Sequence, residues 1–382
     1  MKTLIIALAL CLAACSNAPA QTLSATTKYP SNPVSLSASA WDGYVNYFTI
    51  LNDGGTYKRW YDAFTTSSWT PNGIGHETSS DLATWTKPNL GLVTFGGNTN
   101  NNLIIGAQNY TFNVYKNSGS PAYVGILGDD NGAATPCVQV KTSTDGINWS
   151  ALVTLATNNG KEGQAVYYKN GLWCVYYQQN STTARGIGVF SCPTLSSTAG
   201  DWTDHGVVIS AGSQDTQQYT IFLFDINGTT YAAVPNFNLD TQRMDYIRLY
   251  STADGLSFNL ENANWLAAGA TSDLWDYGMI WIGGVVQYGS EWRVYYGGTD
   301  MLHNDSSLPS RSYMGYATFT VSQPSGVVTL HTRSGPVVMA TGSSAGVGLA
   351  TASGTQDLIV QDAVDNADGA VRIKPGKSLV VQ

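Results

Sequence analysis

A polar turn recurs along this chain and restricts the folds that are open to it. In each copy a strand runs into a Ser/Thr-rich turn that contains an Asp, and an aromatic residue closes the turn. The copies are GIGHETSSDLATW (73–85), CVQVKTSTDGINW (137–149), the looser GIGVFSCPTLSSTAGDW (186–202) and YIRLYSTADGLSF (246–258). A turn that returns roughly every 50 to 65 residues indicates an internally repeated fold.

An aromatic-rich strand precedes each turn and keeps the same rhythm through a fifth copy. Its anchor residues are Trp60, Tyr123, Trp173, Tyr231 and Trp292. Repeats of this length with several short strands each are typical of propeller blades. The two markers together predict an all-β, five-bladed β-propeller over residues 41–333. A generic β-sandwich whose Asp-Gly turns recur by chance is the alternative, and it does not explain two markers in phase.

The segments on either side break this rhythm. Residues 1–20 have the pattern of a signal peptide, with a positive start at Lys2 and an apolar core too short for a stable membrane span. Residues 21–40 are rich in Ser, Thr and Pro and predict a linker or a lead-in strand. Residues 334–382 carry short alternating runs and predict a short C-terminal extension, either a β-hairpin or a partial sandwich.

Two cleavage sites compete at the end of the signal peptide. The Leu-Ala-Ala before Cys15 is similar to the lipobox of bacterial lipoproteins, which would leave a lipidated cysteine. Small residues before Gln21 fit ordinary cleavage, but the first pattern is the more specific. Both patterns predict an exported protein. The lipoprotein pattern predicts a periplasmic or cell-surface location, with the membrane contacted only through lipid at Cys15.

Composition narrows the classes of partner. Charged residues make up 12% of the 382 residues, and the net charge is −8. An acidic chain without a Lys/Arg cluster is a poor candidate for binding nucleic acid. No apolar run of membrane-spanning length follows the N-terminus, and no Cys/His spacing suggests a zinc site. The sequence therefore predicts no cofactor, and it leaves open a structural metal ion at the propeller axis.

Three cysteines remain after the signal peptide, namely Cys137, Cys174 and Cys192. We expect Cys174 and Cys192 on neighbouring strands of one blade, where they could pair in an oxidising compartment. Buried free thiols are an equally good alternative.

Acidic residues precede the first strand of four predicted blades. They are Asp42, Glu162, Asp215 and Asp276, in blades one, three, four and five. The residues that lead into the inner strands converge at one end of a propeller axis. Hydrolysis of a glycosidic bond needs such a meeting of carboxyl groups, because one protonates the leaving oxygen while another activates water or attacks carbon. The alternative is that some of these acids only cap turns at the blade ends.

Other residues near these acids suit sugar binding. Trp41 and Trp275 adjoin two of them, and aromatic rings stack on the C–H faces of sugars, although rings also fill space between blades. Blade two has no lead-in acid and offers Asn113 instead. His303 and Arg311 follow the second strand of blade five, where they could share proton transfer or hold substrate, or could be solvated loop residues.

The stretch GIGHETSSDLATWTKP resembles the first-blade signature of the five-bladed propeller glycosidases, in glycoside hydrolase families 32 and 43. STDGINW and the ending WDYGMIWIGGVV are also similar, so the likeness covers about residues 41–333. The resemblance implies a base or nucleophile in blade one, a pKa-modulating Asp in blade two and a Glu general acid in blade three. Asp42 and Glu162 fall where the first and third would. Asn109 or Asn113 stands where the second would.

Two functions from different classes follow. The first is an exported glycoside hydrolase with Glu162 as general acid, Asp42 as base or nucleophile, and Asp276 in the catalytic set. Its expected substrate-binding residues are Trp41, Asn113, Asp215, Trp275, His303 and Arg311. The second is a glycan-binding surface lipoprotein with a degenerate site, and a purely structural propeller is a weaker third. Carbohydrate is the expected partner in the first two.

Overall fold

The chain is built almost entirely of β-strands. The computed structural model describes residues 22–34, 42–64, 72–106, 110–129, 136–157, 159–180, 185–211, 215–217, 220–238, 240–300, 312–322, 327–332, 335–341, 358–360 and 379–380. Its one helical element within these ranges is a single 3-10 turn, Ala199–Asp201. None of the described residues forms a helix of the length and apolarity needed to cross a membrane.

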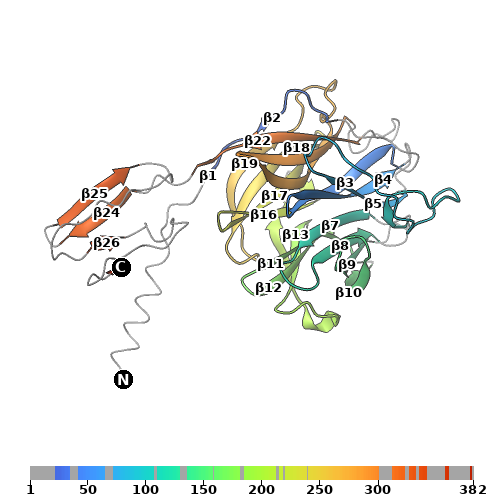
Figure 1. Ribbon diagram of the computed structural model, residues 1–382, viewed down its shortest axis with the longest axis horizontal. Coiled ribbons are helices and arrows are strands. Elements are labelled where there is room, and N and C mark those ends of the chain that lie inside the picture. Colours follow the sequence, from blue (N-terminus) through green and yellow to red (C-terminus); the bar gives the residue numbers. More distant parts are fainter. Residues whose placement is uncertain are drawn as a thin grey trace. The chain divides into compact units, whose positions relative to one another are not determined.

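Five antiparallel sheets form the blades of a propeller, as the sequence predicts (Figure 1). Blade one consists of β3 (Tyr44–Asp53), β4 (Thr56–Phe64), β5 (Gly73–Ser79) and β6 (Leu103–Ile105). Blade two consists of β7 (Tyr110–Lys116), β8 (Tyr123–Asp129), β9 (Pro136–Ser143) and β10 (Ser150–Thr157). Blade three consists of β11 (Lys161–Lys169), β12 (Leu172–Asn180), β13 (Arg185–Cys192) and β14 (Thr203–Ser210).

Blade four has a divided inner strand, made of β15 (Asp215–Gln217) and β16 (Phe222–Ile226), which both pair with β17 (Thr229–Asn238). It continues with β18 (Arg243–Thr252) and β19 (Asn259–Ala267). Blade five consists of β20 (Met279–Tyr288), β21 (Glu291–Thr299), β22 (Ser312–Phe319) and the N-terminal strand β2 (Thr27–Lys28).

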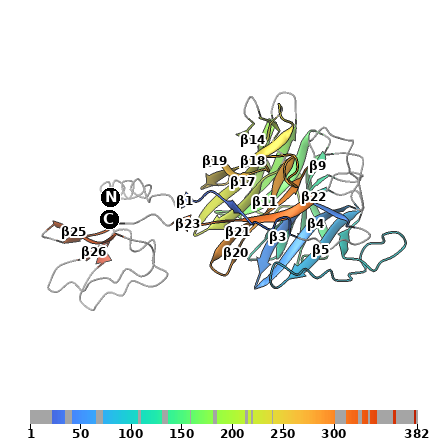
Figure 2. The ribbon, with the colours of Figure 1, turned by 90° about the horizontal axis from the view of Figure 1, so that it is seen from above.

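The inner strands close into a ring. Strand β3 contacts β7, β7 contacts β11, β11 contacts β16, β16 contacts β20, and β20 contacts β3 again. Apolar side chains fill the space between neighbouring blades. Ile126 of blade two and Val175 of blade three, for example, share one buried cluster. In the view from above, β3, β11 and β20 are three of these inner strands (Figure 2).

The N-terminal segment takes part in the propeller. Thr27 and Lys28 pair with Thr318 and Ala317 on β22, which makes β2 the outer strand of blade five. The sequence left open whether residues 21–40 form a linker or a lead-in strand, and β2 supplies a strand. Its partner lies far away in the sequence, so no local pattern identifies the pairing.

Residues from both ends of the chain form a second compact unit. Its described parts are Thr22 to Ser24 and the described residues from Thr320 onward. Here β1 (Thr22–Leu23) pairs with β23 (Val321–Ser322). A second sheet joins β24 (Val327–Thr332), β25 (Gly335–Thr341), β26 (Leu358–Val360) and β27 (Leu379–Val380). The β24–β25 pair is a hairpin in the predicted extension. The sequence pattern placed residues 327–332 in the propeller, whereas in the structure this strand pairs with β25. Its alternating pattern of apolar and polar residues suits a strand of either sheet, so the pattern alone did not distinguish them.

The recurring turn has one hydrogen-bonding pattern in three blades. Ser79, Ser143 and Thr252 each accept a bond from the backbone N–H three residues later. The Asp of each turn, Asp145 for example, accepts two further backbone N–H bonds with one carboxylate oxygen. Side-chain bonds of this kind stabilise a turn without any longer-range contact. They are the physical reason for the sequence repeat.

The three described cysteines are buried free thiols. On the paired strands β12 and β13, Cys174 is opposite Ser191, while Cys192 is opposite Trp173. Residues one register step apart point to opposite faces of a sheet, and the two thiols lie in different apolar clusters. The possible Cys174–Cys192 disulfide is therefore wrong, and the alternative of free thiols holds.

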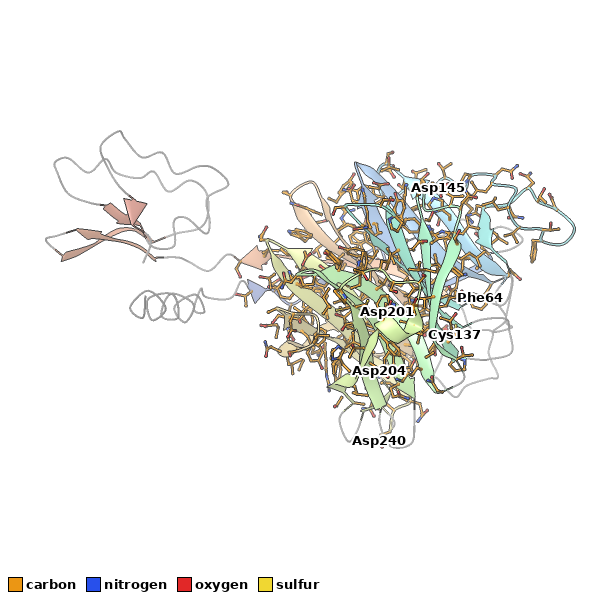
Figure 3. The ribbon with its side chains drawn as sticks, turned by 90° about the horizontal axis from the view of Figure 1, so that it is seen from below. Phe64, Cys137, Asp145, Asp201, Asp204 and Asp240 are labelled. Carbon is orange, nitrogen blue, oxygen red and sulfur yellow. The ribbon has the colours of Figure 1, made fainter. Side chains whose placement is uncertain are left out.

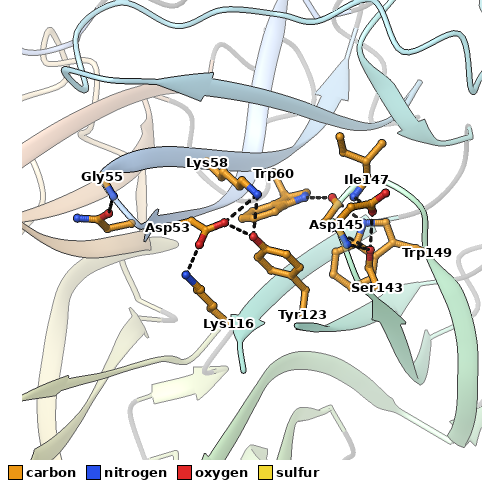
Figure 4. A network of polar contacts seen from close by, with 12 residues as sticks. Asp53, Gly55, Lys58, Trp60, Lys116, Tyr123, Ser143, Asp145, Ile147 and Trp149 are labelled. Carbon is orange, nitrogen blue, oxygen red and sulfur yellow. Dashed lines mark hydrogen bonds and ion pairs between the residues drawn. The ribbon is translucent and has the colours of Figure 1, made fainter. Parts of the chain in front are cut away.

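A polar network joins blades one and two at the ends of their inner strands (Figure 4). Asp53 of β3 forms ion pairs with Lys58 and with Lys116 of β7. It also accepts a hydrogen bond from the Tyr123 hydroxyl of β8. These bonds, the one from Lys116 first, hold the pKa of Asp53 well below its usual range. The network therefore ties the two blades together through an ionised carboxylate.

Candidate functional site

The candidate site is the end of the ring where the inner strands begin. Of the residues predicted for it, Trp41, His303 and Arg311 lie outside the described residues. The backbone of Asp215 opens β15, and its side chain is likewise outside the description. Asn113 lies half-buried on β7, opposite Ile126 of β8. The positions of the remaining acids can be compared directly.

Asp42 lies against its own blade. Its carboxylate is buried, forms a 2.6 Å ion pair with Lys87 and accepts a 2.6 Å hydrogen bond from the Tyr61 hydroxyl. Asn102 donates to the same hydroxyl oxygen over 2.8 Å. Burial raises the pKa of Tyr61 well above its ordinary value, so this tyrosine remains a donor. The arrangement keeps Asp42 as a paired carboxylate.

Asp276 has the same kind of environment in blade five. Its buried carboxylate pairs with Lys28 of β2 at 2.6 Å and accepts a 3.0 Å hydrogen bond from the Tyr296 hydroxyl of β21. Burial raises the pKa of Tyr296 far above its usual range. The neighbouring Trp275 stacks on the Tyr296 ring with centroids 5.3 Å apart. Both residues thus pack on the sheet of blade five.

Blade three repeats the arrangement with an acid from its outer strand. The Tyr177 hydroxyl donates a 2.7 Å hydrogen bond to Asp204 of β14, and Lys161 forms an ion pair with the same carboxylate. Asp204 is labelled in Figure 3. Tyr61, Tyr177 and Tyr296 occupy the sixth position of β4, β12 and β21. This Tyr–Asp–Lys arrangement is therefore a recurring device of the blades, and Asp42 and Asp276 are two of its members.

Glu162 lies in a different setting, at the interface of blades two and three. It is the second residue of β11, next to Lys161, and its side chain is half-buried. The Thr111 hydroxyl of β7 donates a 3.1 Å hydrogen bond to Glu162 Oε1. Lys161 thus pairs with Asp204 of its own blade, whereas Glu162 contacts Thr111 of blade two.

Asp62 is a carboxyl group of this site that the sequence analysis missed. It lies on β4 of blade one, is fully buried, and its Oδ2 accepts a 3.0 Å hydrogen bond from the Thr111 backbone N–H. Burial raises its pKa to about 8, and the charge of Glu162 adds to this effect, whereas the backbone amides of Thr111 and Phe112 lower it. The signal available in the sequence was a lone acid inside the aromatic strand TYKRWYDAF.

Thr111 therefore bridges two carboxyl groups from blades one and three. The Asp62 and Glu162 carboxyl oxygens bonded to Thr111 are therefore at most about 9 Å apart, the upper end of the separations that glycosidase carboxyl pairs show. Glu162 is the more accessible of the two, because Asp62 is fully buried and contacts Glu162 only by way of Thr111.

Several buried polar side chains in blades three, four and five have no hydrogen-bond partner among the described residues. Among the described residues, both amide atoms of Gln164 on β11, both of Asn236 on β17, the Thr220 hydroxyl before β16 and the Trp281 Nε1 of β20 find no hydrogen-bond partner. Buried polar groups are rarely left unpaired, and unpaired ones mark places where water or a ligand binds. Blades three, four and five thus offer unpartnered groups that can bind hydroxyls.

The described residues contain no group of three or more His, Cys, Asp or Glu side chains placed to hold a metal ion. The candidate site as described consists of carboxyl, hydroxyl and amide groups with aromatic neighbours. These groups can donate and accept protons and can bind hydroxyl-rich molecules.

Comparison with known proteins supports the fold. No family model and no curated protein matches the chain. A glycosyl hydrolase structure from Bacteroides ovatus is similar at a TM-score of 0.55 and 15% identity, covering 79% of this chain and 94% of that one. A structure from the GH130 family of mannoside phosphorylases, which contains glycoside hydrolases that target β-1,2 mannosidic linkages in Candida mannan, has a TM-score of 0.55, 14% identity and coverages of 81% and 97%.

A further similar structure is an N-acetylgalactosamine deacetylase from F. plautii in complex with blood group B trisaccharide, with a TM-score of 0.53, 13% identity and coverages of 78% and 95%. At such identities the likeness concerns the fold alone. The propeller-glycosidase fold suggested by the sequence motifs is thus confirmed, and glycoside hydrolases are among the proteins that share it.

Proposed function

We propose that this protein is an exported glycoside hydrolase that cleaves oligo- or polysaccharide at the end of the ring where the inner strands begin. Glu162 is its general acid. One observation carries the proposal: Glu162 is the half-buried member of a carboxyl pair that Thr111 bridges across three blades. Glycosidases set the proton affinity of a catalytic carboxyl group by its surroundings, and the Thr111 bond places Glu162 in such a defined environment.

The remaining predicted roles complete the proposal. Asp42 is the base or nucleophile suggested by the family resemblance, and Asp276 orients substrate together with His303. The unpartnered amides of Gln164 and Asn236 supply hydrogen bonds to sugar hydroxyls. Export rests on the N-terminal signal pattern, and anchoring rests on Cys15.

A specific observation favours the second function, a glycan-binding protein without catalysis. Asp42 and Asp276 each form an ion pair with a lysine of their own blade. A carboxylate held in this way is less available to activate water. In this version the same groups bind sugar hydroxyls and no bond is cleaved.

Release of reducing sugar distinguishes the two functions. The purified protein is incubated with a panel of plant and algal polysaccharides and oligosaccharides, beside Glu162→Gln and the matched control Glu261→Gln on the exposed outer strand β19. We expect release by the wild type and by the control, and a loss of at least about 10²-fold in Glu162→Gln.

Other outcomes of this experiment have distinct meanings. Release that survives in Glu162→Gln would keep the enzyme and refute the role of Glu162. No release from any substrate, together with calorimetric binding of one of them, would support the glycan-binding function.

A further inference from the structure

We infer that Asp62 is a positioning residue for Glu162 and that Thr111 couples the two carboxyl groups into one unit. The inference rests on the proposed function, in which Glu162 is the general acid. It assigns a place in the site to an acid of blade one that lies inside the aromatic strand and does not precede an inner strand.

The first argument is the placement of Asp62. The residue lies inside β4, opposite Ile74 of β5, and has no exposed surface. Its Oδ2 accepts the Thr111 N–H, and its Oδ1 has no hydrogen-bond partner among the described residues. A buried carboxyl without an ion pair is costly unless it is neutral or has a function that retains it. The Tyr–Asp–Lys acids, in contrast, are all neutralised by lysine.

The second argument is the backbone of Thr111. This residue has a φ of +55°, which is unfavourable for a β-branched side chain. Such a conformation persists only where the surroundings impose it, and it is common at functional sites. Here it lets one residue direct its N–H to Asp62 in blade one while its hydroxyl reaches Glu162 in blade three. An extended residue would lose one of these two contacts.

The third argument is the glycine across from Thr111. A Cβ on Gly128 of β8 would lie 2.4 Å from the Gly163 carbonyl oxygen, 3.0 Å from Glu162 Cγ and 3.1 Å from Thr111 Cβ. Any larger residue would therefore push blade three away from blade two at this point. The missing side chain is what allows Glu162 to approach Thr111.

The charges around Asp62 are few. Among the described groups, Glu162 is the titratable residue whose charge acts on it, and the neighbouring dipoles are the amides of Thr111 and Phe112. Asp62 consequently keeps its proton at neutral pH, and it accepts the Thr111 bond without carrying a charge of its own. An asparagine can do the same, because its amide oxygen accepts the bond and it carries no charge.

Kinetics of conservative and disruptive variants test the inference on a substrate that the wild type cleaves. We expect Asp62→Asn and Thr111→Ser to keep kcat within about fivefold, and Asp62→Ala and Thr111→Val to lower kcat by about 10-fold to 100-fold with little change in KM. Thermal unfolding first establishes that each variant is folded. A folded Asp62→Ala or Thr111→Val with wild-type kcat would overturn the inference.

An infrared measurement tests the coupling without any activity. The carbonyl band of a protonated carboxylic acid is followed against pH in the full-length wild type, Asp62→Asn, Glu162→Gln and the control Glu261→Gln. We expect a band that is absent in Asp62→Asn and that disappears in the wild type near pH 8. It should disappear at lower pH in Glu162→Gln, because the raising effect of that charge is gone, and at an unchanged pH in the control.

Stability provides a second readout with a defined sign. The folded pKa of Asp62, about 8, lies above its unfolded value near 4, so its contribution to stability is full below pH 4 and is lost as pH rises through 8. The wild type should therefore lose more stability than Asp62→Asn between these pH values. If no polysaccharide is cleaved, the proposed function fails, but the infrared and stability measurements still show whether Asp62 and Glu162 are coupled. An unaltered band in Glu162→Gln would refute the coupling even in an active enzyme.

Discussion

Trp60 of β4 donates a 2.7 Å hydrogen bond from its Nε1 to the carbonyl oxygen of Gly146, in the polar turn of the next blade (Figure 4). The contact recurs between blades three and four, where the Tyr176 hydroxyl donates to the Gly255 carbonyl oxygen over 2.8 Å. The aromatic strand of one blade therefore contacts the turn of the following blade. This pairing explains why the two sequence markers stay in phase.

The contact changes where blade five meets blade one. Tyr295 occupies the strand position of Trp60 and Tyr176, but its hydroxyl has no partner among the described residues. The glycine of the turn is replaced there by Leu82, which keeps a positive φ of +61°. Leu82 is buried in the apolar cluster that also contains Tyr295. Apolar packing thus takes the place of the hydrogen bond at this blade junction.

The Trp60–Gly146 contact predicts that a side chain added at Gly146 destabilises the fold by a steric clash, in addition to any backbone strain. Gly146 and Gly171 have nearly equal φ values, +82° and +81°, but an added Cβ at Gly146 would lie 2.8 Å from Trp60 Cζ2, while one at Gly171 would meet no atom within 4 Å. Both alanine variants incur about 1 kcal/mol for the left-handed backbone, and we expect Gly146→Ala to lose about 1–3 kcal/mol more. Urea unfolding measures the difference, and equal losses would contradict it.

The Tyr177–Asp204 bond predicts a change in acid stability. Burial alone would raise the pKa of Asp204, yet the bonds from Lys161 and Tyr177 lower it below its usual value. Its contribution to stability is present above the unfolded pKa of about 3.9 and is lost as pH falls below it. Tyr177→Phe removes one of these bonds, so its acid unfolding midpoint should move to higher pH.

The matched control for this prediction is Tyr168→Phe, an exposed tyrosine of the same blade. It should unfold in acid at the wild-type pH. A Tyr177→Phe variant that follows the control would show that the hydroxyl bond does not stabilise the ionised Asp204.

The cysteine arrangement predicts three free thiols, at Cys137, Cys174 and Cys192. Burial raises the pKa of Cys174 to about 11, which makes this thiol unreactive in the folded protein. Thiol-reactive dye added to protein denatured without reductant should label all three residues. The melting temperature should be the same with and without dithiothreitol, and a drop on reduction would reveal a disulfide.

The fold was predictable because each blade repeats local chemistry. Turns held by their own Ser and Asp side chains leave a pattern that a sequence shows directly, as at Ser143 and Asp145. The outer strand of blade five was less predictable, because Thr27 pairs with Thr318, and pairing over such a separation has no local signal. The hairpin beginning at Val327 has the same alternation of apolar and polar residues as a blade strand. The sequence therefore could not show which sheet it joins.

The candidate site was only partly predictable for a related reason. Glu162 could be found because it lies at the start of an inner strand, where propeller geometry gathers residues. Asp62 could not be found in this way, because the alternation of a strand does not reveal that the Asp62 side chain contacts Thr111 of the next blade. The ion pairs of Asp42 and Asp276 depend on lysines from other segments, Lys87 and Lys28, which no spacing rule connects to them.

The closing strand β2 also determines how the propeller bears mechanical load. Thr27 and Lys28 pair with β22, reinforced by the Lys28–Asp276 ion pair and by backbone bonds such as that from Tyr29 to Tyr316. A pull on the N-terminal segment would load the β1–β23 pair first and then this short seam. Peeling it away would strip blade five of its outer strand and leave Asp276 without its lysine.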